Sequence, residues 1–284
     1  MSNFYLRNPQ ISCVARKDTY LFLQGGSVVC EIEQADVDGL SEILQELSLP
    51  TSAAKTTELL EVEALSVLLE NRILLTGTEE ALAAYLPPAQ PSELPCPRLV
   101  FGVTGAVASM HTASLLFELY HSFAEKIDVI CTEAAHHFTQ PEVLSYLGLE
   151  VWSDAFQPKG EINVPHIHLA TSASLIVVFP ASAHTLYKLA HGACSDLLSL
   201  TISATRAPVV LIPAMNDAMW SQPAIKRNVQ QLRRDGFYVV EPTLGVEVAK
   251  RRGGYRDYGN AGVAGSLSTL LRGIWTHHQS KQPR

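Results

Sequence analysis

Residues 98–105 read RLVFGVTG, an apolar run that ends on a glycine-rich turn. Similar apolar runs follow within 126–135, 175–183 and 207–216, and helical stretches separate them. Continuous apolar runs are typical of strands that are buried on both faces of a parallel sheet, with helices covering those faces. The sequence therefore predicts an α/β domain over residues 98–275, built on a Rossmann-like (flavodoxin-like) parallel sheet.

A proline-rich segment precedes this domain. Residues 86–97, LPPAQPSELPCP, carry five prolines. Proline fixes φ and removes an amide donor, so neither a helix nor a central strand continues through such a segment. We interpret residues 86–97 as a linker that separates the α/β domain from a smaller domain over residues 1–85.

The smaller domain shows a different order of predicted elements. TYLFL at 19–23 and SVVCEI at 27–32 flank a Gly-Gly turn, which predicts a β-hairpin. Helical periodicity follows over 35–47 and 58–73, with a weakly marked helix between, and ILLTG at 73–77 predicts a last strand. This order predicts a small α+β winged-helix-like fold. It resembles the precursor-peptide recognition domains of enzymes that tailor ribosomally made peptides, and a dimerisation or packing domain is the alternative.

The charge distribution limits the partners. The formal net charge is −7, and acidic residues far outnumber basic ones before residue 96, whereas the remainder is close to balance. Nucleic-acid binding depends on clustered Lys and Arg, so we predict no nucleic-acid partner. An extended basic or neutral peptide, added to a strand edge, suits the acidic domain better.

The sequence lacks the patterns of a membrane span, a secretory signal and a zinc site. No apolar run approaches the roughly 20 residues that span a bilayer, and MSNFYLRNPQ does not resemble a secretory signal, so we predict a cytoplasmic protein without a membrane partner. The five cysteines are scattered, with no CxxC pair and no histidine at zinc-ligand spacing. We therefore predict free thiols and no metal site.

Candidate site residues follow the ends of the predicted strands, where ligands of parallel sheets gather. The turn at 102–107 suits a phosphate, because its glycines allow close approach and a helix begins there, although such a turn can also serve the chain reversal alone. It lacks the GxGxxG pattern, which argues against NAD. In PASAHT, 180–185, the hydroxyls either contact a flat polar ligand or cap a helix. In PAMNDAMW, 213–220, Asn216 likewise either caps a helix or holds a ligand.

VPHIHLA, 164–170, contributes two histidines. We expect this segment to be extended, so that His166 and His168 share one face. Such a pair serves either polar packing or proton transfer, because a histidine can take or give a proton near neutral pH.

Six motifs stand together in one order: GVTGAVAS, CTEAAHHF, HIHL, PASAHT, HGACSDLL and PAMNDAMW. Over about residues 97–265 this set resembles the homo-oligomeric flavin-containing cysteine decarboxylases, a family that includes phosphopantothenoylcysteine decarboxylases and lantibiotic peptidyl-cysteine decarboxylases. The resemblance implies an FMN cofactor, catalytic roles for His166 and Asn216, and a homotrimer or dodecamer. It implies FMN binding by Thr104, Gly105, Ala106, Thr132, Ser182, Ala183, His184, Thr185 and Ala214, and substrate binding by Met215, Asn216, Arg252, Tyr255 and Arg256.

The implied reaction is oxidative decarboxylation of the C-terminal cysteine of a ribosomally made precursor peptide, which leaves an aminoenethiol. The leader of that peptide would bind the amino-terminal domain. Arg252, Tyr255 and Arg256 lie in a glycine-rich loop that either closes over the peptide terminus or is simply a surface loop.

Two departures from the family pattern matter. His184 stands where the family usually has asparagine, which puts the flavin contacts at that point in doubt. Phosphopantothenoylcysteine decarboxylases use a cysteine in the carboxy-terminal substrate loop, and residues 241–284 contain none. A small-molecule decarboxylase of that kind and a non-catalytic flavoprotein scaffold that recruits a peptide are therefore the alternatives.

Overall fold

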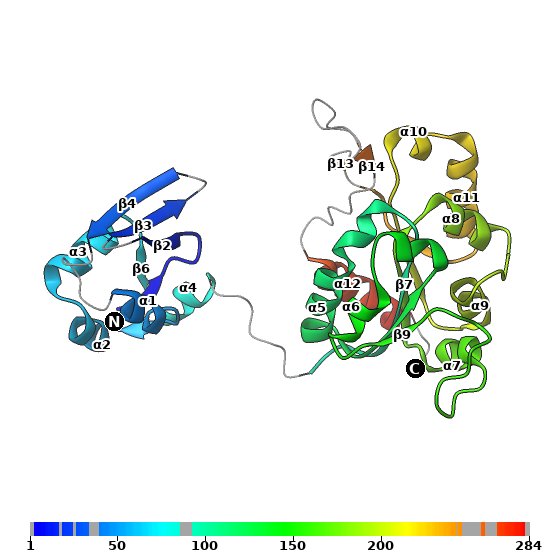
Figure 1. Cartoon of the computed structure of the whole chain (residues 1–284), viewed down its shortest axis with the longest axis horizontal. Helices are drawn as coiled ribbons and strands as arrows, with labels where there is room; N and C mark the ends of the chain where they lie inside the picture. The colour runs from blue at the N-terminus through cyan, green and yellow to red at the C-terminus, as the bar shows by residue number, and fades with distance from the viewer. Residues whose placement is uncertain are drawn as a thin grey trace. The chain divides into compact units, whose positions relative to one another are not determined.

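The computed structural model describes residues 3–16, 19–24, 27–33, 40–85, 93–242, 244–245, 257–258 and 266–281. The chain divides into two compact units, residues 1–89 and 90–284, and the division falls inside the proline-rich segment (Figure 1). Within the described residues, no helix has the length and apolar character needed to cross a membrane.

In its described residues, the first unit contains two antiparallel three-stranded sheets with short helices. Its elements are β1 Phe4–Arg7, β2 Ser12–Arg16, β3 Thr19–Gln24, β4 Ser27–Glu33, α1 Leu40–Glu46, β5 Thr51–Ser52, α2 Ala53–Leu59, α3 Val62–Glu70, β6 Leu74–Gly77 and α4 Glu79–Ala83. One sheet has the order β2-β3-β4 and the other β5-β1-β6.

The predicted hairpin is confirmed as the antiparallel pair of β3 and β4. The three predicted helices are present as α1 to α3, and α1 and α3 pack their apolar faces into a core with Phe22, Leu44 and Leu68. The sequence did not predict β1, β2, β5 or α4. Because β1 lies between β5 and β6, the unit has a second sheet that the predicted hairpin-and-helix order lacks, and the likeness to a winged helix stays a prediction.

The second unit is built on a six-stranded parallel sheet. The strands are β7 Cys96–Val103, β8 Ala124–Cys131, β9 Glu150–Trp152, β10 Leu175–Ala181, β11 Val209–Pro213 and β12 Tyr238–Val239. Their order is β12-β11-β10-β7-β8-β9, which is the 3-2-1-4-5-6 order of a Rossmann sheet rather than the 2-1-3-4-5 order of flavodoxins. The predicted Rossmann-like parallel sheet is confirmed.

Helices cover both faces of this sheet (Figure 1). They are η2 Val107–His111, α5 Thr112–Ser122, η3 Glu133–His137, α6 Pro141–Ser145, α7 Pro165–Ser172, α8 Ala183–Ala190, α9 Leu197–Ala204, α10 Asp217–Trp220, α11 Pro223–Arg234 and α12 Leu267–Ser280. Helices α5, α6 and α12 pack on one face, and α7, α8, α9 and α11 on the other. Successive strand residues alternate between these two cores, with Phe101 in the first and Val100 in the second. This explains why the strands are apolar without polar alternation.

Candidate cofactor and active site

Helical segments begin at the carboxyl ends of four sheet strands. β7 leads into η2, β8 into η3, β10 into α8 and β11 into α10, and the residues that precede these helices are Ala106, Thr132, Ser182 and Asn216. The first N–H groups of a helix have no partner within it and carry partial positive charge. Backbone amide donors therefore gather at the end of the sheet that carries the carboxyl ends of the strands, and such donors suit an anionic group.

The strand order predicts a ligand-binding crevice at these carboxyl ends. β7 and β10 are neighbours in the sheet, but their chains continue in opposite directions across it, which makes this pair the switch point where ligands of such sheets bind. The turn after β7 also lies tightly against η3, because a Cβ on Gly105 would be 2.5 Å from the Cβ of Ala134. Only glycine fits there without a shift of the backbone. The predicted cofactor residues at 104–106, 132 and 182–185 thus lie on three adjacent strand ends.

The hydroxyl of Thr104 is not directed at this crevice. Thr104 is fully buried, and its Oγ1 donates to the carbonyl oxygen of Pro180 at 2.5 Å and accepts from the backbone N–H of Ser182 at 3.0 Å. Both bonds join the turn after β7 to the turn after β10. The resemblance implies FMN binding by Thr104, and in the cofactor-free structure the hydroxyl of this residue is engaged by the protein's own backbone.

The PASAHT turn shows the capping role that the sequence left open. Ser182 Oγ accepts from the backbone N–H of Thr185 at 3.3 Å and lies 3.0 Å from Thr185 Oγ1. His184 is exposed in the first turn of α8, whereas Ala183 is half-buried. On the neighbouring strand end Ala214 is buried, and its N–H donates to Ala181 at 3.2 Å. Small side chains at these positions leave room for a flat ring.

Asn216 answers the question that the PAMN motif raised. Its Oδ1 accepts from the backbone N–H of Met219 at 2.9 Å and so caps α10. Because Oδ1 is used in this way, the two N–H donors on Nδ2 face away from the helix end. Asn216 and the adjacent Met215 are half-buried. The side chain can therefore cap a helix and hold a carboxylate at the same time.

The predicted extended His-x-His segment is wrong. Residues 165–172 form α7, with Pro165 at its amino end. Neighbours two apart on a helix point about 200° from each other, so His166 and His168 do not share a face. Among the described residues, the buried Nδ1 of His166 has no hydrogen-bond partner. A buried polar atom without a hydrogen-bond partner is uncommon in a protein interior and often marks a functional position.

His168 belongs to a cluster that the sequence analysis missed. Arg98 Nε lies 2.6 Å from Oδ2 of the fully buried Asp128, and Trp152 Nε1 donates to the other carboxylate oxygen at 3.2 Å. Arg98 Nη2 lies 3.1 Å from His168 Nε2. Burial, and then the Arg98 charge, lower the pKa of His168 below its usual value. The signal was Asp128 itself, because a carboxylate inside the apolar run KIDVIC requires a partner.

The cysteines are free, as predicted. Burial raises the pKa of Cys96 and of Cys131 to about 12, so neither is a reactive thiol. In the described part of the chain, no group of three or more His, Cys, Asp or Glu side chains is placed to hold a metal ion. The predicted substrate residues Arg252, Tyr255 and Arg256 lie outside the described residues.

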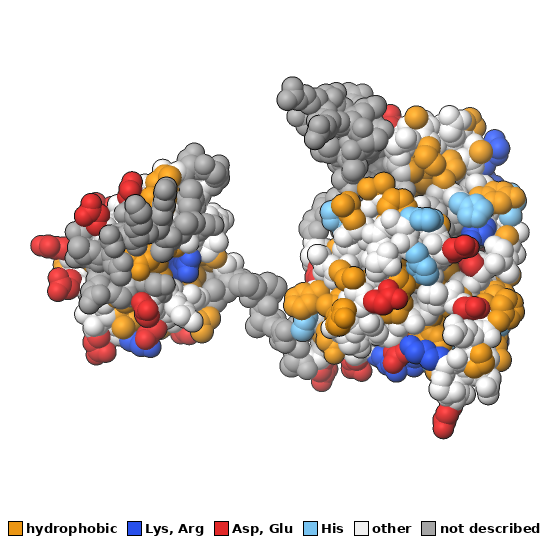
Figure 2. Space-filling view, in the orientation of Figure 1, with side chains coloured by type: hydrophobic (Ala, Val, Ile, Leu, Met, Phe, Trp, Pro, Cys, Tyr) orange, Lys and Arg blue, Asp and Glu red, His pale blue; other side chains and the backbone are white. Residues whose placement is uncertain are grey.

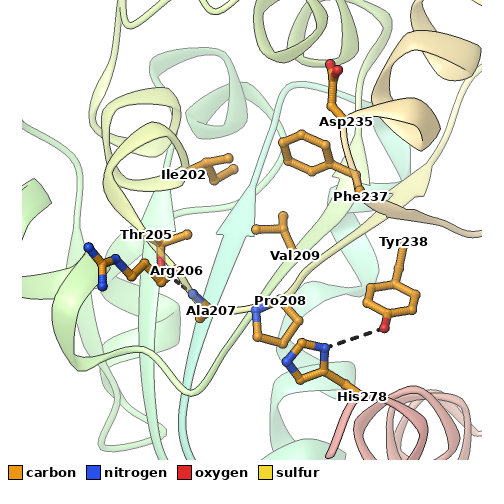
Figure 3. Close-up of a pocket in the computed structure, with 11 residues that line it drawn as sticks. Ile202, Thr205, Arg206, Ala207, Pro208, Val209, Asp235, Phe237, Tyr238 and His278 are labelled. Atoms are coloured by element: carbon orange, nitrogen blue, oxygen red, sulfur yellow. Dashed lines mark hydrogen bonds between the residues drawn. The ribbon is translucent and has the colours of Figure 1, made fainter. Parts of the chain in front are cut away.

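A cavity of about 310 Å³ lies at the opposite edge of the sheet, where β11 and β12 begin (Figure 3). Val209, Phe237 and Pro208 contribute apolar surface to this cavity. The hydroxyl oxygen of Tyr238 lies 3.5 Å from Nδ1 of His278. This edge carries the amino ends of the strands, so it lacks the helix amino ends that gather at the other edge. We therefore place the cofactor site at the crevice beside Gly105 and not in this cavity.

Comparison with known proteins identifies the class. A family profile described as Flavoprotein matches residues 88–266, which is more than half of the chain. The chain belongs to the Flavoprotein family. The geometry fits a flavin, because the crevice combines amide donors for a phosphate with small residues that admit a ring.

The chain is similar to curated proteins of two different descriptions. The chain is 38% identical over 144 residues to the coenzyme A biosynthesis bifunctional protein CoaBC of Bacillus subtilis, which covers 50% of this chain but 35% of that protein. It is 31% identical over 147 residues to the mersacidin decarboxylase of a Bacillus species, which covers 51% of this chain and 73% of that protein. The match therefore spans only about a third of CoaBC.

Solved structures give the same picture. The FMN-dependent cysteine decarboxylase SpaF is 32% identical with a TM-score of 0.52, over 62% of this chain and 96% of that one. A PPC decarboxylase mutant complexed with pantothenoylaminoethenethiol is 26% identical with a TM-score of 0.57, over 64% of this chain and 99% of that one. Flavin-dependent cysteine decarboxylases are thus among the neighbours of this flavoprotein in both sequence and structure.

Proposed function

We propose that this flavoprotein is an FMN-dependent oxidative decarboxylase that acts on the C-terminal cysteine of a ribosomally made precursor peptide. The observation that carries the proposal is Asn216, whose oxygen is fixed by the α10 amide so that two N–H donors remain at the sheet edge. A carboxylate is the natural partner of such donors.

FMN would be held by the strand ends that meet at the crevice. The backbone of Gly105 and Ala106 and the first turns of η3 and α8 would bind the phosphate and ribityl chain, while Ala214 would lie against the ring. His184 is exposed, so its side chain can move aside and does not block the crevice.

The chemistry requires an electron acceptor and two protein groups. Bound FMN supplies the two-electron oxidation that makes the cysteine carboxylate labile. Asn216 would hold and orient this carboxylate until CO₂ leaves, and the imidazole of His166 would accept the proton that the cysteine thiol gives up when a hydride leaves its Cβ. The peptide loses CO₂ and two hydrogens in total and ends as an aminoenethiol.

A peptide substrate is supported by the first unit. Among the described residues, β4 pairs only with β3, so its other edge is open to an added strand. Val28 and Val29 on β4 are 54% and 39% exposed, and the surrounding unit is acidic. An extended leader with apolar and basic residues fits such an edge by β-augmentation. The likeness to mersacidin decarboxylase also favours a peptide.

A small-molecule thiol acid is the second candidate. The identity to CoaBC and the fold of PPC decarboxylase favour it. A small molecule would not need the first unit for binding, whereas a peptide leader would. We therefore prefer the peptide substrate.

We further propose that the site is completed between copies of the chain, in a homotrimer or dodecamer. Helix α7 buries Pro165, Leu169 and Ala170, and the half-buried His166 at its amino end has a buried Nδ1 that finds no hydrogen-bond partner among the described residues. Exposed apolar side chains lie on both helical layers of this unit, including Phe117 on α5, Val143 on α6 and Ile167 on α7. Figure 2 shows separate hydrophobic patches on its surface. Neighbouring copies would cover such patches and bring a second chain's His166 to this crevice.

The main test is direct. Purified protein is denatured and its released flavin identified, and the holoprotein is then incubated with leader-bearing peptides that end in cysteine, in cysteine amide or in serine. We expect a product that lacks CO₂ and two hydrogens from the free cysteine peptide alone. Turnover of phosphopantothenoylcysteine but of no peptide would replace our proposal with the second candidate.

The shared site has its own test. His166→Asn and Asn216→Ala should each remove turnover. Oligomers reassembled from a mixture of the two variants should regain part of it, because some crevices then combine an intact His166 from one copy with an intact Asn216 from another. Oligomers that stay inactive after subunit exchange has been verified contradict a site shared between copies.

A further inference from the structure

The sheet hydrogen bonds between β7 and β10 stop before the two turns that flank the crevice. Their register runs from Leu175 opposite Leu99 to Val178 opposite Gly102 and ends there. On the other side of β10 the register with β11 shifts between Val178 and Ala181. The ladder with β11 resumes at Ala181, opposite Pro213, but on the β7 side the backbone groups beyond Val178 need partners that the sheet does not supply.

Thr104 supplies two of them. Pro180 has no N–H, and its carbonyl oxygen accepts from Thr104 Oγ1 at 2.5 Å. The N–H of Ser182 donates to the same oxygen atom at 3.0 Å. A hydroxyl has one proton, so the donor capacity of Thr104 is fully used, and its 0% exposure leaves no path to a ligand.

The backbone of the same residue fixes its own turn. Thr104 O accepts from Ser109 Oγ at 2.6 Å and from Ala106 N at 2.9 Å. Its neighbour Gly105 touches η3 at a spacing that excludes a Cβ. Thr104 therefore stands where the turns after β7 and β10 meet, with η3 held against the following residue.

We propose that Thr104 is a positioning residue that ties the turn after β7 to the turn after β10 across the switch point and makes no contact with the cofactor. It sets the separation between the amides at 105–106 and those that begin α8. The expected effect on FMN binding rests on the proposed function. The hydrogen-bonded link between the two turns is present in the cofactor-free protein and does not depend on it.

The test compares three variants of the full chain. Thr104→Val keeps the shape and removes the hydroxyl, and Thr104→Ser keeps the hydroxyl. Thr201→Val is the matched control, because Thr201 is also fully buried and its Oγ1 donates to a carbonyl, Leu197 O, but within α9. All three tryptophans lie after residue 95, so tryptophan fluorescence follows the melting of the second unit alone.

Without FMN, Thr104→Val should lower the melting temperature of the second unit by roughly 5 °C, because it leaves two buried backbone groups unpaired. Hydrogen exchange of the Ser182 amide should accelerate at least tenfold. The Kd for FMN, measured by flavin fluorescence, should rise at least tenfold. Thr104→Ser should stay within about threefold of the unmodified protein, and Thr201→Val should leave FMN binding and Ser182 exchange unchanged.

Two outcomes would overturn the inference. Weakened FMN binding with unchanged melting and Ser182 exchange would mean that the hydroxyl contacts the cofactor directly. Unchanged FMN binding in Thr104→Val would mean that the tie does not set the crevice.

If Thr104→Val fails to fold, Ser182 exchange in the cofactor-free unmodified protein and in Thr104→Ser decides, since an unprotected amide there rules out the tie. Failure of the unmodified protein to bind FMN would refute the proposed function, and the melting and exchange results would still report on the tie itself.

Discussion

Replacing Asp128 by asparagine tests the reasoning about the buried cluster. Asp128 is fully buried and pairs with Arg98, whose side chain is 18% exposed. Removing one partner of a buried ion pair costs about 3–5 kcal/mol, and the slight exposure of Arg98 places the expectation near the lower limit, at about 3 kcal/mol. The matched control is Glu150→Gln. Glu150 lies opposite Asp128 in the sheet register, but it and its partner Lys159 are 51% and 47% exposed, so we expect a loss of at most about 1 kcal/mol.

Urea unfolding followed by tryptophan fluorescence measures both variants in the second unit. With a slope of about 2 kcal/mol/M, Asp128→Asn should lower the urea midpoint by about 1.5 M and Glu150→Gln by less than about 0.5 M. Equal shifts for the two variants would refute the claim that burial decides the strength of these pairs.

Three further predictions concern the crevice and α7. Asn216→Asp keeps the cap on α10 but replaces the amide donors by a negative charge, so turnover should fall by at least about a hundredfold with little change in melting temperature; full turnover would exclude a carboxylate contact. Gly105→Ala should raise the Kd for FMN at least about tenfold because of the 2.5 Å approach to Ala134, whereas Gly273→Ala, at an open position in α12, should slightly raise the melting temperature and leave FMN binding unchanged. Because the pKa of His168 is lowered, its contribution to stability should be complete above about pH 6.5 and be lost as the pH falls from there through its lower folded value. Urea midpoints across this range should fall less steeply in His168→Gln, and an identical pH profile would contradict the assignment.

The main features of the parallel sheet could be predicted because its strands are apolar on both faces. LIVVF and VVLI contain no polar residue that would favour a helix or a one-sided strand, and they became β10 and β11. FYVVEP, 237–242, likewise indicated the last strand and became β12, whereas the short β9 escaped prediction, since a three-residue strand carries too little periodicity.

α7 was mistaken for an extended segment because alternation was given more weight than the start signal. His-Ile-His-Leu alternates polar and apolar residues, as a strand does, but Pro165 at its beginning is typical of the first turn of a helix. The roles of Thr104 and Asn216 depend on which backbone groups lie within hydrogen-bond distance. Sequence spacing does not contain that information, so the choice between capping and ligand binding stayed open until the structure placed Met219 and Pro180.

The strand order makes the second unit two interlocked halves. β7, β8 and β9 form one block and β10, β11 and β12 the other, and only β7 and β10 meet between them. The C-terminal helix then returns across that boundary, because α12 packs on α5 and Ser268 binds Glu118 in the first block. A cut in the chain between Trp152 and Pro165 would therefore leave two fragments that pack on each other through the β7–β10 pair and through α12. The two fragments should reassemble when they are coexpressed.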